Sequence, residues 1–296
     1  MTESCRPVTP GLSNVSRMSN LAVEQLSPPL DEHAPAGAVR TGFRGLYRDF
    51  FDHAEAKRRW SVVDGIPWDL VKIRAVDEDL VEILEAFYSV EMYLPDYSAK
   101  LIALNRQNHG MAWFFTDWCY EESKHSMAIE EWLIRSGRRT PAQMELLNER
   151  LLSVEWTLPF DSGRQMLIYS MLQELATQLN YINLSKLTAP AGDQALQRLI
   201  LLIASDEGSH HRMCVDCVRA YIDLDRAATV DDIAFVVQHF EMPAHDLIPD
   251  WQRKGELIER HRIYGGRQFV MRVLLPALKK LGVDRRELQL SRVRAG

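Results

Sequence analysis

The chain has 296 residues, of which 46% are hydrophobic and 26% charged, enough to bury the core of one large domain or two small ones. Its formal net charge of -6, with both signs interspersed, argues against general nucleic-acid binding, and no apolar run approaches the roughly 18 residues of a membrane span. The N-terminus lacks the pattern of a secretory signal and is too acidic for a transit peptide, so we expect a cytoplasmic protein.

Residues 1–38 are rich in Ser, Pro, Gly and Ala, and prolines such as Pro28 and Pro35 interrupt any periodicity. Such a segment cannot bury enough apolar surface to offset the entropy of ordering, so we interpret it as a flexible leader without a catalytic role. Over residues 39–296 apolar positions recur with helical spacing and loops are marked by Gly or Pro, which predicts one all-α domain.

Four long helices are expected to form the core of this domain, at residues 76–106, 110–136, 161–189 and 193–222. The short turns near Gly110 and Pro190 make two antiparallel hairpins, and two hairpins packed face to face form a four-helix bundle. Shorter helices are expected to pack around the outside, at residues 42–58, 141–152, 229–240 and 254–281.

The most specific pattern in the chain is a Glu-x-x-His step that occurs twice, each time after a lone helical glutamate, at separations of 31 and 33 residues. Positions i and i+3 of a helix share a face, so one turn can present a carboxylate and an imidazole to the same ion. Ferritin-like di-metal proteins use one Glu from each of two helices and one Glu-x-x-His from each of the others. The six expected metal ligands are Glu91, Glu122, His125, Glu174, Glu207 and His210.

Counting residues to the turns, at 1.5 Å each, puts the paired ligands level to within about 8 Å in the first hairpin and about 2 Å in the second. Apolar neighbours such as Phe87, Met171 and Ile203 indicate buried ligand faces. A single step could arise by chance on a solvated face, but four buried carboxylates would be prohibitively costly unless two divalent cations balanced them. Oxygen and imidazole ligands without thiolate favour iron or manganese over zinc.

Pro95 is expected to kink the first long helix at the metal site. A proline inside a helix has no N–H to donate, and its ring clashes with the carbonyl four residues earlier. Here that carbonyl belongs to Glu91, so the kink and the first ligand should coincide.

On these residues the chain resembles the soluble acyl-carrier-protein desaturases, the plant stearoyl type and its bacterial relatives, over roughly residues 45 to 285. The matching stretches are Glu91–Pro95, Trp118–His125, Gln173–Thr177, Asp206–His210 and Met242–His245. The resemblance implies a homodimer with two iron ions per chain, electrons from a ferredoxin, and an acyl chain delivered as a thioester on acyl carrier protein. The implied reaction uses dioxygen to remove two hydrogens from adjacent methylenes and leaves a cis double bond.

The resemblance also implies roles for three residues beside the ligands. Thr177, one turn from Glu174, matches a threonine that supports oxygen activation; the alternative is a hydroxyl that bonds its own helix. Asp206 and Trp60 match an aspartate that joins a ligand histidine to a surface tryptophan, the alternative being a plain surface aspartate and a core tryptophan.

The chain departs from the family pattern inside and after the second step. Gly208 and Ser209 replace the usual basic pair, and His211 replaces an acidic residue. His211 points about 100° away from His210 on a helix, so we expect it not to be a ligand. Surface contacts beside this helix are expected to differ from those of the family.

Other functions stay open from the sequence. A di-iron hydroxylase or N-oxygenase is one, although arylamine N-oxygenases of this fold carry an extra ligand histidine where this chain has Ile203. An iron-binding or inactive relative is another, although no ligand is missing. The sequence does not determine acyl chain length, double-bond position or pathway.

An acidic carrier protein would need a local basic surface on a chain of net charge -6. The run Lys57-Arg58-Arg59 is the first candidate, and a second consists of Lys279, Lys280, Arg285 and Arg286. The alternative for both clusters is an ordinary solvated face.

Overall fold

The computed structural model describes residues 37–288, and over this range the chain forms helices joined by turns, with no β-strand. The all-α prediction is confirmed. The predicted leader, residues 1–38, lies outside the described residues except for its last two positions, where the first helix has already begun. The last eight residues, 289–296, also lie outside them.

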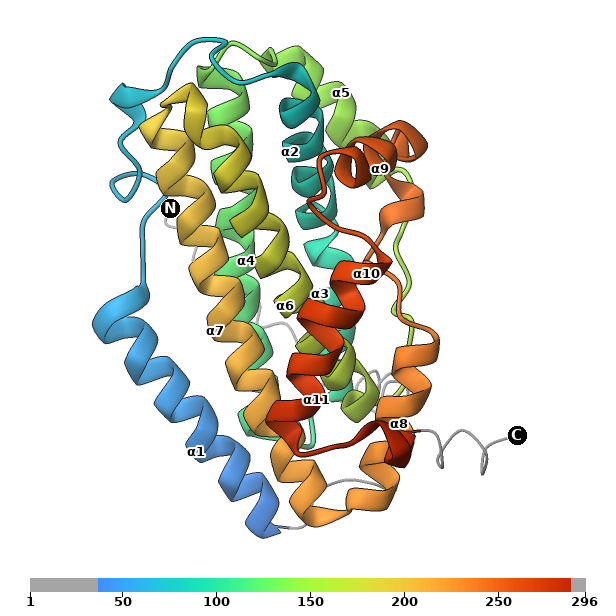
Figure 1. Ribbon diagram of the computed structural model, residues 1–296. Helices are drawn as coiled ribbons and strands as arrows, with labels where there is room; N and C mark the ends of the chain where they lie inside the picture. Colours follow the sequence, from blue (N-terminus) through green and yellow to red (C-terminus); the bar gives the residue numbers. More distant parts are fainter. Residues whose placement is uncertain (1–36, 289–296) are drawn as a thin grey trace, which may run out of the picture. The chain divides into compact units, whose positions relative to one another are not determined.

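The core consists of α2 (Glu78–Glu91) continued by α3 (Leu94–Leu104), with α4 (His109–Arg135), α6 (Gly163–Thr188) and α7 (Gln194–Leu224). These are the four rods of the predicted bundle, and Figure 1 shows α4, α6 and α7 running side by side. Helices α6 and α7 pack along their length, while α4 contacts α2, α3 and α7. The predicted four-helix core is confirmed.

Side chains cap the N-termini of three core helices, two of them at the hairpin turns. The side chains of Asn108, Ser162 and Asp193 accept hydrogen bonds from the first-turn amides of α4, α6 and α7, respectively. Asp193 also accepts hydrogen bonds from Trp132 Nε1 at 3.1 Å and from the Lys72 amide at 3.0 Å. This buried carboxylate therefore ties α7 to α4 at one end of the bundle.

The predicted helix at 76–106 is two helices, and the break falls at the expected point. α2 ends at Glu91, and α3 begins at Leu94 with Pro95 in its first turn. Proline is well suited to a first turn because it has no amide hydrogen to leave unpaired. The discontinuity places Glu91 at a helix end, facing the centre of the bundle.

Helix α1 (Gly37–His53) crosses α4 and ends in a π-helical turn, Ala54–Arg58. The crossing requires Gly110, since a Cβ atom there would lie 2.5 Å from the backbone of Phe43. The π turn is wider than an α turn, and its last residue, Arg58, reaches Glu121 on α4 and Asp206 on α7.

The outer helices are α5 (Pro141–Leu152), α8 (Arg226–Gln238), α9 (Trp251–Arg260), α10 (Gly266–Gln268) and α11 (Leu275–Leu281), with a π-helical segment at Phe269–Leu274. Short 3-10 turns lie at Trp68–Leu70, Ala189–Ala191 and His245–Leu247. α5 has its predicted bounds and begins with a capping box between Thr140 and Gln143.

The prediction of one helix over 254–281 is wrong. The chain leaves α9 after Arg260, takes a left-handed conformation at Arg262 (φ 55°) and resumes as a helix at Gly266. α9 packs on α2, whereas the π-helical segment packs on α6 (Figure 1). One straight helix could not reach both surfaces.

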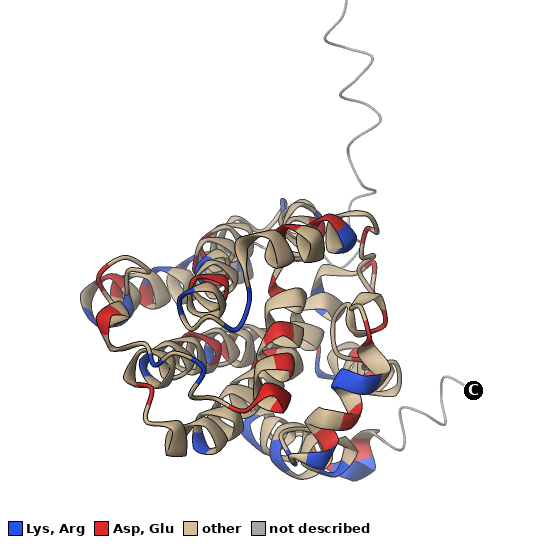
Figure 2. Cartoon of the chain, turned by 90° about the horizontal axis from the view of Figure 1, so that it is seen from above, with Lys and Arg blue, Asp and Glu red and all other residues tan. Residues whose placement is uncertain are grey.

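Acidic and basic residues are interspersed over most helices of the described chain (Figure 2). No helix among residues 37–288 is long and apolar enough to cross a membrane.

Candidate metal centre

The six sequence-predicted ligand residues meet in the middle of the bundle. Glu91 comes from the end of α2, Glu122 and His125 from α4, Glu174 from α6, and Glu207 and His210 from α7. All six are at least 95% buried. They form two overlapping groups, each with one potential ligand atom per residue within 4.8 Å of the others: Glu91, Glu122, His125 and Glu207, and then Glu122, Glu174, Glu207 and His210. This cage can hold two metal ions that share Glu122 and Glu207.

Both imidazoles turn Nδ1 toward the cage. His125 Nδ1 lies 3.5 Å from a carboxylate oxygen of Glu122 and 3.5 Å from one of Glu207. His210 Nδ1 lies 3.0 Å from Glu122 and 3.3 Å from Glu174. The two Nδ1 lone pairs therefore face the same space as the four carboxylates.

The outer nitrogens are held by a second pair of carboxylates, in a crossed arrangement. Asp206 on α7 faces Nε2 of His125 on α4 at 3.4 Å, and Glu121 on α4 faces Nε2 of His210 on α7 at 2.7 Å. A carboxylate that accepts the Nε2–H leaves the Nδ1 lone pair free for a metal and fixes the orientation of the ring.

Arg58 joins these two outer carboxylates. Its guanidinium donates to Asp206 at 2.5 Å and to Glu121 at 2.8 Å, and its side chain is only 7% exposed. Arg59 also contacts Glu121, and it donates to Asp117 at 2.6 Å. Arg58 and Arg59 are therefore not free for the predicted carrier-docking surface, because both charges are used in ion pairs within the protein, whereas Lys57 of the same run is exposed.

Trp60 lies against the same network. Its Nε1 donates to Asp206 at 2.7 Å, and its ring is stacked parallel to that of His125, with centroids 6.4 Å apart. The ring is 8% exposed and lies beneath the ammonium group of Lys124, which is 4.5 Å from the ring centroid. The structure thus brings Trp60, Asp206 and His125 into one continuous chain of contacts, with a buried tryptophan instead of a surface one.

Two further residues that the sequence analysis did not select hold the cage carboxylates. Trp118 Nε1 donates to Glu174 at 3.0 Å, and Tyr181 donates its hydroxyl hydrogen to Glu91 at 2.9 Å. Glu121 and Arg58 were also not selected as site residues. A signal for Glu121 was present, because an acidic residue precedes the glutamate of both Glu-x-x-His steps.

Thr177 lies one turn beyond Glu174, and its oxygen accepts a hydrogen bond from Gln173 Nε2 at 3.2 Å. Within the described residues, the Thr177 hydroxyl does not bond the backbone of its own helix, whereas Thr116 and Thr188 do bond the carbonyl four residues earlier. Its hydroxyl hydrogen remains available toward the interior.

His211 lies outside the cage, as predicted. Its Nδ1 is 2.8 Å from the carbonyl oxygen of Met171, and its Nε2 accepts from Lys280 at 3.1 Å. Both ring nitrogens are therefore used away from the metal site.

The charge balance of the cage fits metal ions. Both carboxylate oxygens of Glu207 and Nδ1 of His125 are buried without a hydrogen-bond partner among the described residues. Burial and the neighbouring Glu122 carboxylate raise the pKa of Glu91 to about 8, and burial with the same neighbour raises that of Glu207 well above its usual range. The protein without metal must therefore keep protons where two cations would otherwise supply positive charge.

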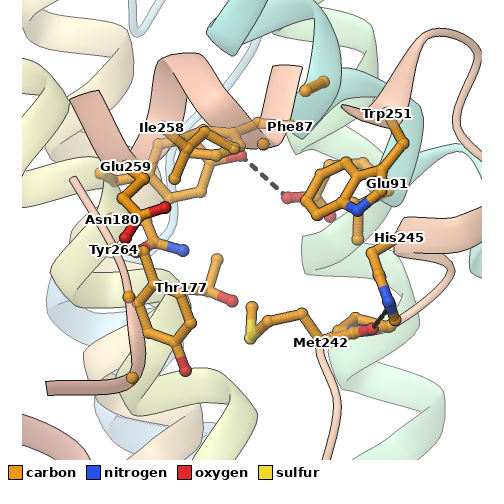
Figure 3. A pocket seen from close by; sticks show the side chains of 17 residues that line it. Phe87, Glu91, Thr177, Asn180, Met242, His245, Trp251, Ile258, Glu259 and Tyr264 are labelled. Carbon is orange, nitrogen blue, oxygen red and sulfur yellow. Dashed lines mark hydrogen bonds between the residues drawn. The ribbon is translucent and has the colours of Figure 1, made fainter. Parts of the chain in front are cut away.

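A cavity of about 280 Å³ reaches this cage from the side of α9. Its wall includes Glu91 and Thr177, and the segment with Met242 and His245 forms its other side (Figure 3). A second cavity, of about 30 Å³, lies beside Trp118 and shares Val90, Glu91, Thr177 and Pro243 with the first. The cage therefore borders an internal space that is large enough for part of an organic substrate.

The family model described as "Fatty acid desaturase" matches residues 73–294. The chain therefore belongs to the fatty acid desaturase family. Among curated proteins it is similar to DesA1 of Mycobacterium tuberculosis, described as an acyl-[acyl-carrier-protein] desaturase, with 25% identity over 81% of this chain and 71% of that protein. It is also similar to stearoyl-[acyl-carrier-protein] 9-desaturase 2 of Arabidopsis thaliana, with 25% identity over 59% of this chain and 44% of that enzyme.

Among solved structures, DesA2 of M. tuberculosis, described as an acyl-carrier-protein desaturase, matches with a TM-score of 0.61 and 19% identity, over 86% of this chain and 99% of that one. An R2-like ligand-binding oxidase with a Mn/Fe cofactor matches with a TM-score of 0.55 and 14% identity, over 82% and 93%. These likenesses confirm the predicted ferritin-like fold.

Replacing Arg58 with methionine should destabilise the protein by about 3–5 kcal/mol, because it removes the buried guanidinium that bridges the carboxylates of Asp206 and Glu121. Metal affinity should fall about 10- to 100-fold as both imidazoles lose their fixed orientation. Denaturant unfolding and metal titration measure the two effects. Arg48→Met, in an exposed ion pair with Asp52, is the control and should cost less than about 1 kcal/mol. Wild-type stability in Arg58→Met would contradict the buried role.

Proposed function

We propose that the protein is a di-iron desaturase that introduces a cis double bond into an acyl chain carried on acyl carrier protein, and that residues 39–296 form its single catalytic domain. One observation carries the proposal: the cavity beside α9 has Glu91 and Thr177 in its wall, so a bound chain would lie against the cage. The family membership and the six converging ligand side chains support it.

The reaction consumes one dioxygen, two electrons and two protons for each pair of hydrogens removed, and gives the alkene and two waters. Two iron ions, held by the six cage residues, would supply the redox chemistry with dioxygen. The carboxylate and imidazole donor set suits iron or manganese, and the R2-like oxidase of similar fold carries a Mn/Fe cofactor. We propose iron in both positions, which metal analysis of the active protein distinguishes from a mixed pair.

Side chains around the cage hold the six expected metal ligands in place. Asp206 and Glu121 hold the imidazoles, while Trp118 and Tyr181 hold the carboxylates of Glu174 and Glu91. We propose that the free hydroxyl hydrogen of Thr177 bonds oxygen at the cage. We also propose that electrons arrive along Trp60, Asp206 and His125, which are in continuous contact.

A di-iron oxygenase, such as a hydroxylase or an N-oxygenase, is the second candidate, and the fold of the R2-like oxidase favours it. The position of the extra histidine of N-oxygenases is occupied by Ile203, which is fully buried in apolar surroundings. An inactive iron-binding relative is disfavoured because all six cage residues are present.

We further propose a homodimer that takes electrons from a ferredoxin. An exposed apolar stripe supports the dimer: Trp113, Tyr120 and Met127 recur every seven residues on α4 and are about half exposed. Exposed, evenly spaced large apolar residues are typical of a surface that another chain covers. A monomeric mass in sedimentation would contradict this part of the proposal.

With Arg58 and Arg59 engaged in ion pairs within the protein, we propose that acyl carrier protein docks on the second basic cluster. Lys279, Lys280, Arg285 and Arg286 are all exposed on and after α11. Such exposed charges would act mainly on the association rate and would weaken with salt.

The test is incubation of iron-loaded protein with a panel of acyl carrier protein thioesters, reduced ferredoxin and isotopically labelled dioxygen, followed by mass analysis of the acyl chains. The expected product has lost two hydrogens and contains no labelled oxygen. Thr177→Val should keep its iron and consume oxygen with less alkene formed per oxygen, while Thr188→Val, whose hydroxyl bonds its own helix, should retain wild-type coupling. A dominant product that contains labelled oxygen would establish the oxygenase instead.

A further inference from the structure

Asn180 on α6 carries a buried side-chain amide that makes no hydrogen bond to the part of the chain that the structure describes. Its side chain is 5% exposed, and its Oδ1 has no partner among the described residues. It lines the cavity of about 280 Å³, and its amide nitrogen points into the open space (Figure 3). Buried amides are normally paired, because an unpaired one loses its hydrogen bonds to water without compensation.

Other asparagines show that this protein can pair such groups. Asn105 donates to the Leu101 carbonyl at 2.9 Å, and Asn183, one turn beyond Asn180 on the same helix, donates to the Ile263 carbonyl at 2.9 Å. Asn180 differs from them in facing the cavity. Because Asn180 faces the cavity, a bound molecule can supply the missing hydrogen bond.

Thr177 adds a second free donor on the same face of α6. Its hydroxyl lies in the wall of the cavity, one turn before Asn180 (Figure 3). At a rise of 1.5 Å per residue, Thr177 and Asn180 lie about 4.5 Å and about 9 Å beyond Glu174 along the helix axis. The two donors thus form a short polar track that leads away from the cage.

The rest of the cavity wall is mixed, and it also includes the polar side chains of Glu259 and Tyr264 (Figure 3). Phe87, Val90 and Ile258 are apolar, and Gly255 and Gly266 present only backbone. His245 already uses its Nδ1 with the Met242 carbonyl at 2.9 Å, and Tyr181 donates to Glu91. A plain hydrocarbon in this cavity would leave the Asn180 amide unpaired, at a cost to binding.

We propose that Asn180 hydrogen-bonds a polar group of the substrate about 9 Å from the cage along α6, so that the substrate class is an acyl thioester with an oxygen or nitrogen function close to the reacting carbons. This inference rests on the proposed desaturase function. The polar group has two possible sources with the same chemistry: a hydroxyl or amide substituent on the acyl chain, or the thioester and amide of the carrier arm when the chain is short.

The test measures binding without turnover, in metal-loaded protein kept free of oxygen and electron donor. The probes are octanoyl and 3-hydroxyoctanoyl thioesters of acyl carrier protein, titrated while the fluorescence of Trp251, which lines the cavity, is followed against a Trp251→Phe reference. The wild type should bind the hydroxyacyl probe about tenfold more tightly, as one good hydrogen bond to an otherwise unpaired amide implies. The near-isosteric variant Asn180→Leu should lose that preference.

If the carrier arm supplies the polar group, Asn180→Leu weakens both probes by the same factor, and the wild type shows no preference. Asn180→Ser, which keeps a hydrogen-bonding group, should fall between the two proteins. The melting temperature separates a binding role from a structural one, because removing an unpaired amide should leave it unchanged or raise it. Asn183→Leu, which breaks a paired amide, should lower the melting temperature and leave the probe preference intact.

Wild-type affinity of Asn180→Leu for both probes would overturn the proposal, and so would a lower melting temperature together with unchanged probe preference. These outcomes are independent of the proposed reaction. If the protein were an oxygenase, the proposed desaturase function would fail but the wild type would still prefer the hydroxyacyl probe. If Asn180 did not contact the substrate, this preference would be absent but the protein would still form alkenes from plain acyl chains.

Discussion

Replacing His210 with alanine should lower bound metal from about two ions per chain, as the paired site implies, to one or fewer, and should abolish turnover. His210 is fully buried, and its Nδ1 lies between Glu122 and Glu174, at 3.0 and 3.3 Å. Without it, one of the two overlapping ligand groups loses its only nitrogen donor. Metal analysis of protein loaded under anaerobic conditions measures the stoichiometry.

His211→Ala is the matched control for this variant. His211 is the next residue along α7 and is equally buried, but its nitrogens contact Met171 and Lys280 outside the cage. It should therefore keep full metal content. Two ions in His210→Ala, or metal loss in His211→Ala alone, would require a different ligand set.

The metal-free protein should lose stability as pH rises from about 6 to about 9, while the metal-loaded protein should change little. Burial and the Glu122 charge raise the pKa of Glu91 from 4.5 to about 8. For His125, burial alone would lower the pKa, but Glu122, Asp206 and Glu91 outweigh it and raise the pKa from 6.5 to about 10. Both folded-state pKa values exceed the unfolded ones, so the folded protein binds more protons and each contribution is lost as pH rises.

Glu91 loses its contribution between its unfolded and folded pKa values, 4.5 and about 8, and His125 between 6.5 and about 10. These pH ranges overlap between pH 6.5 and 8, where each group can lower the free energy of unfolding by up to about 1.4 kcal/mol per pH unit. Glu122 acts at the acid end instead: the imidazoles of His125 and His210 outweigh its burial and lower its pKa to about 2, so its contribution is lost below pH 4.5. Bound metal replaces the protons and removes the slope. Denaturant unfolding at a series of pH values measures this pH dependence of the free energy of unfolding, with and without metal.

Glu91→Gln, which mimics the protonated acid, is the control for this effect. It should remove the part of the slope that comes from Glu91 in the metal-free protein and keep the part that comes from His125. If the metal-free wild type became more stable as pH rises above 6.5, this would contradict the inference that its folded cage binds more protons than the unfolded chain does.

The bundle and its six converging residues could be predicted from the sequence because both depend on local periodicity. The i, i+3 spacing of Glu122 and His125 fixes their common face, and the repeat at Glu207 and His210 fixes the second. Pro95 likewise marks the end of α2 through a local steric rule.

Features that depend on long-range packing could not be predicted in the same way. From the sequence, the basic run that ends at Arg59 is expected to be a solvated face. In the structure, Arg58 lies at the end of the π turn that follows α1 and contacts Asp206 and Glu121, which are distant in sequence. The crossed pairing of Glu121 with His210 joins different helices, so spacing along one helix does not contain it.

The break between α9 and α10 was also missed, although Gly265 and Gly266 mark its end. Apolar residues recur on both sides of the break, and this favoured a continuous helix. The break matters for the proposed function, because Gly265 and Gly266 line the larger cavity together with Tyr264 (Figure 3).

The most direct test of the proposed di-iron site in the cage is anomalous X-ray scattering at the iron absorption edge from crystals of the iron-loaded protein. We expect two anomalous peaks inside the bundle, both in contact with Glu122 and Glu207, one beside His125 and the other beside His210. The larger cavity should open onto the peak near Glu91. A single peak, or peaks bound by residues other than these six, would contradict the assignment.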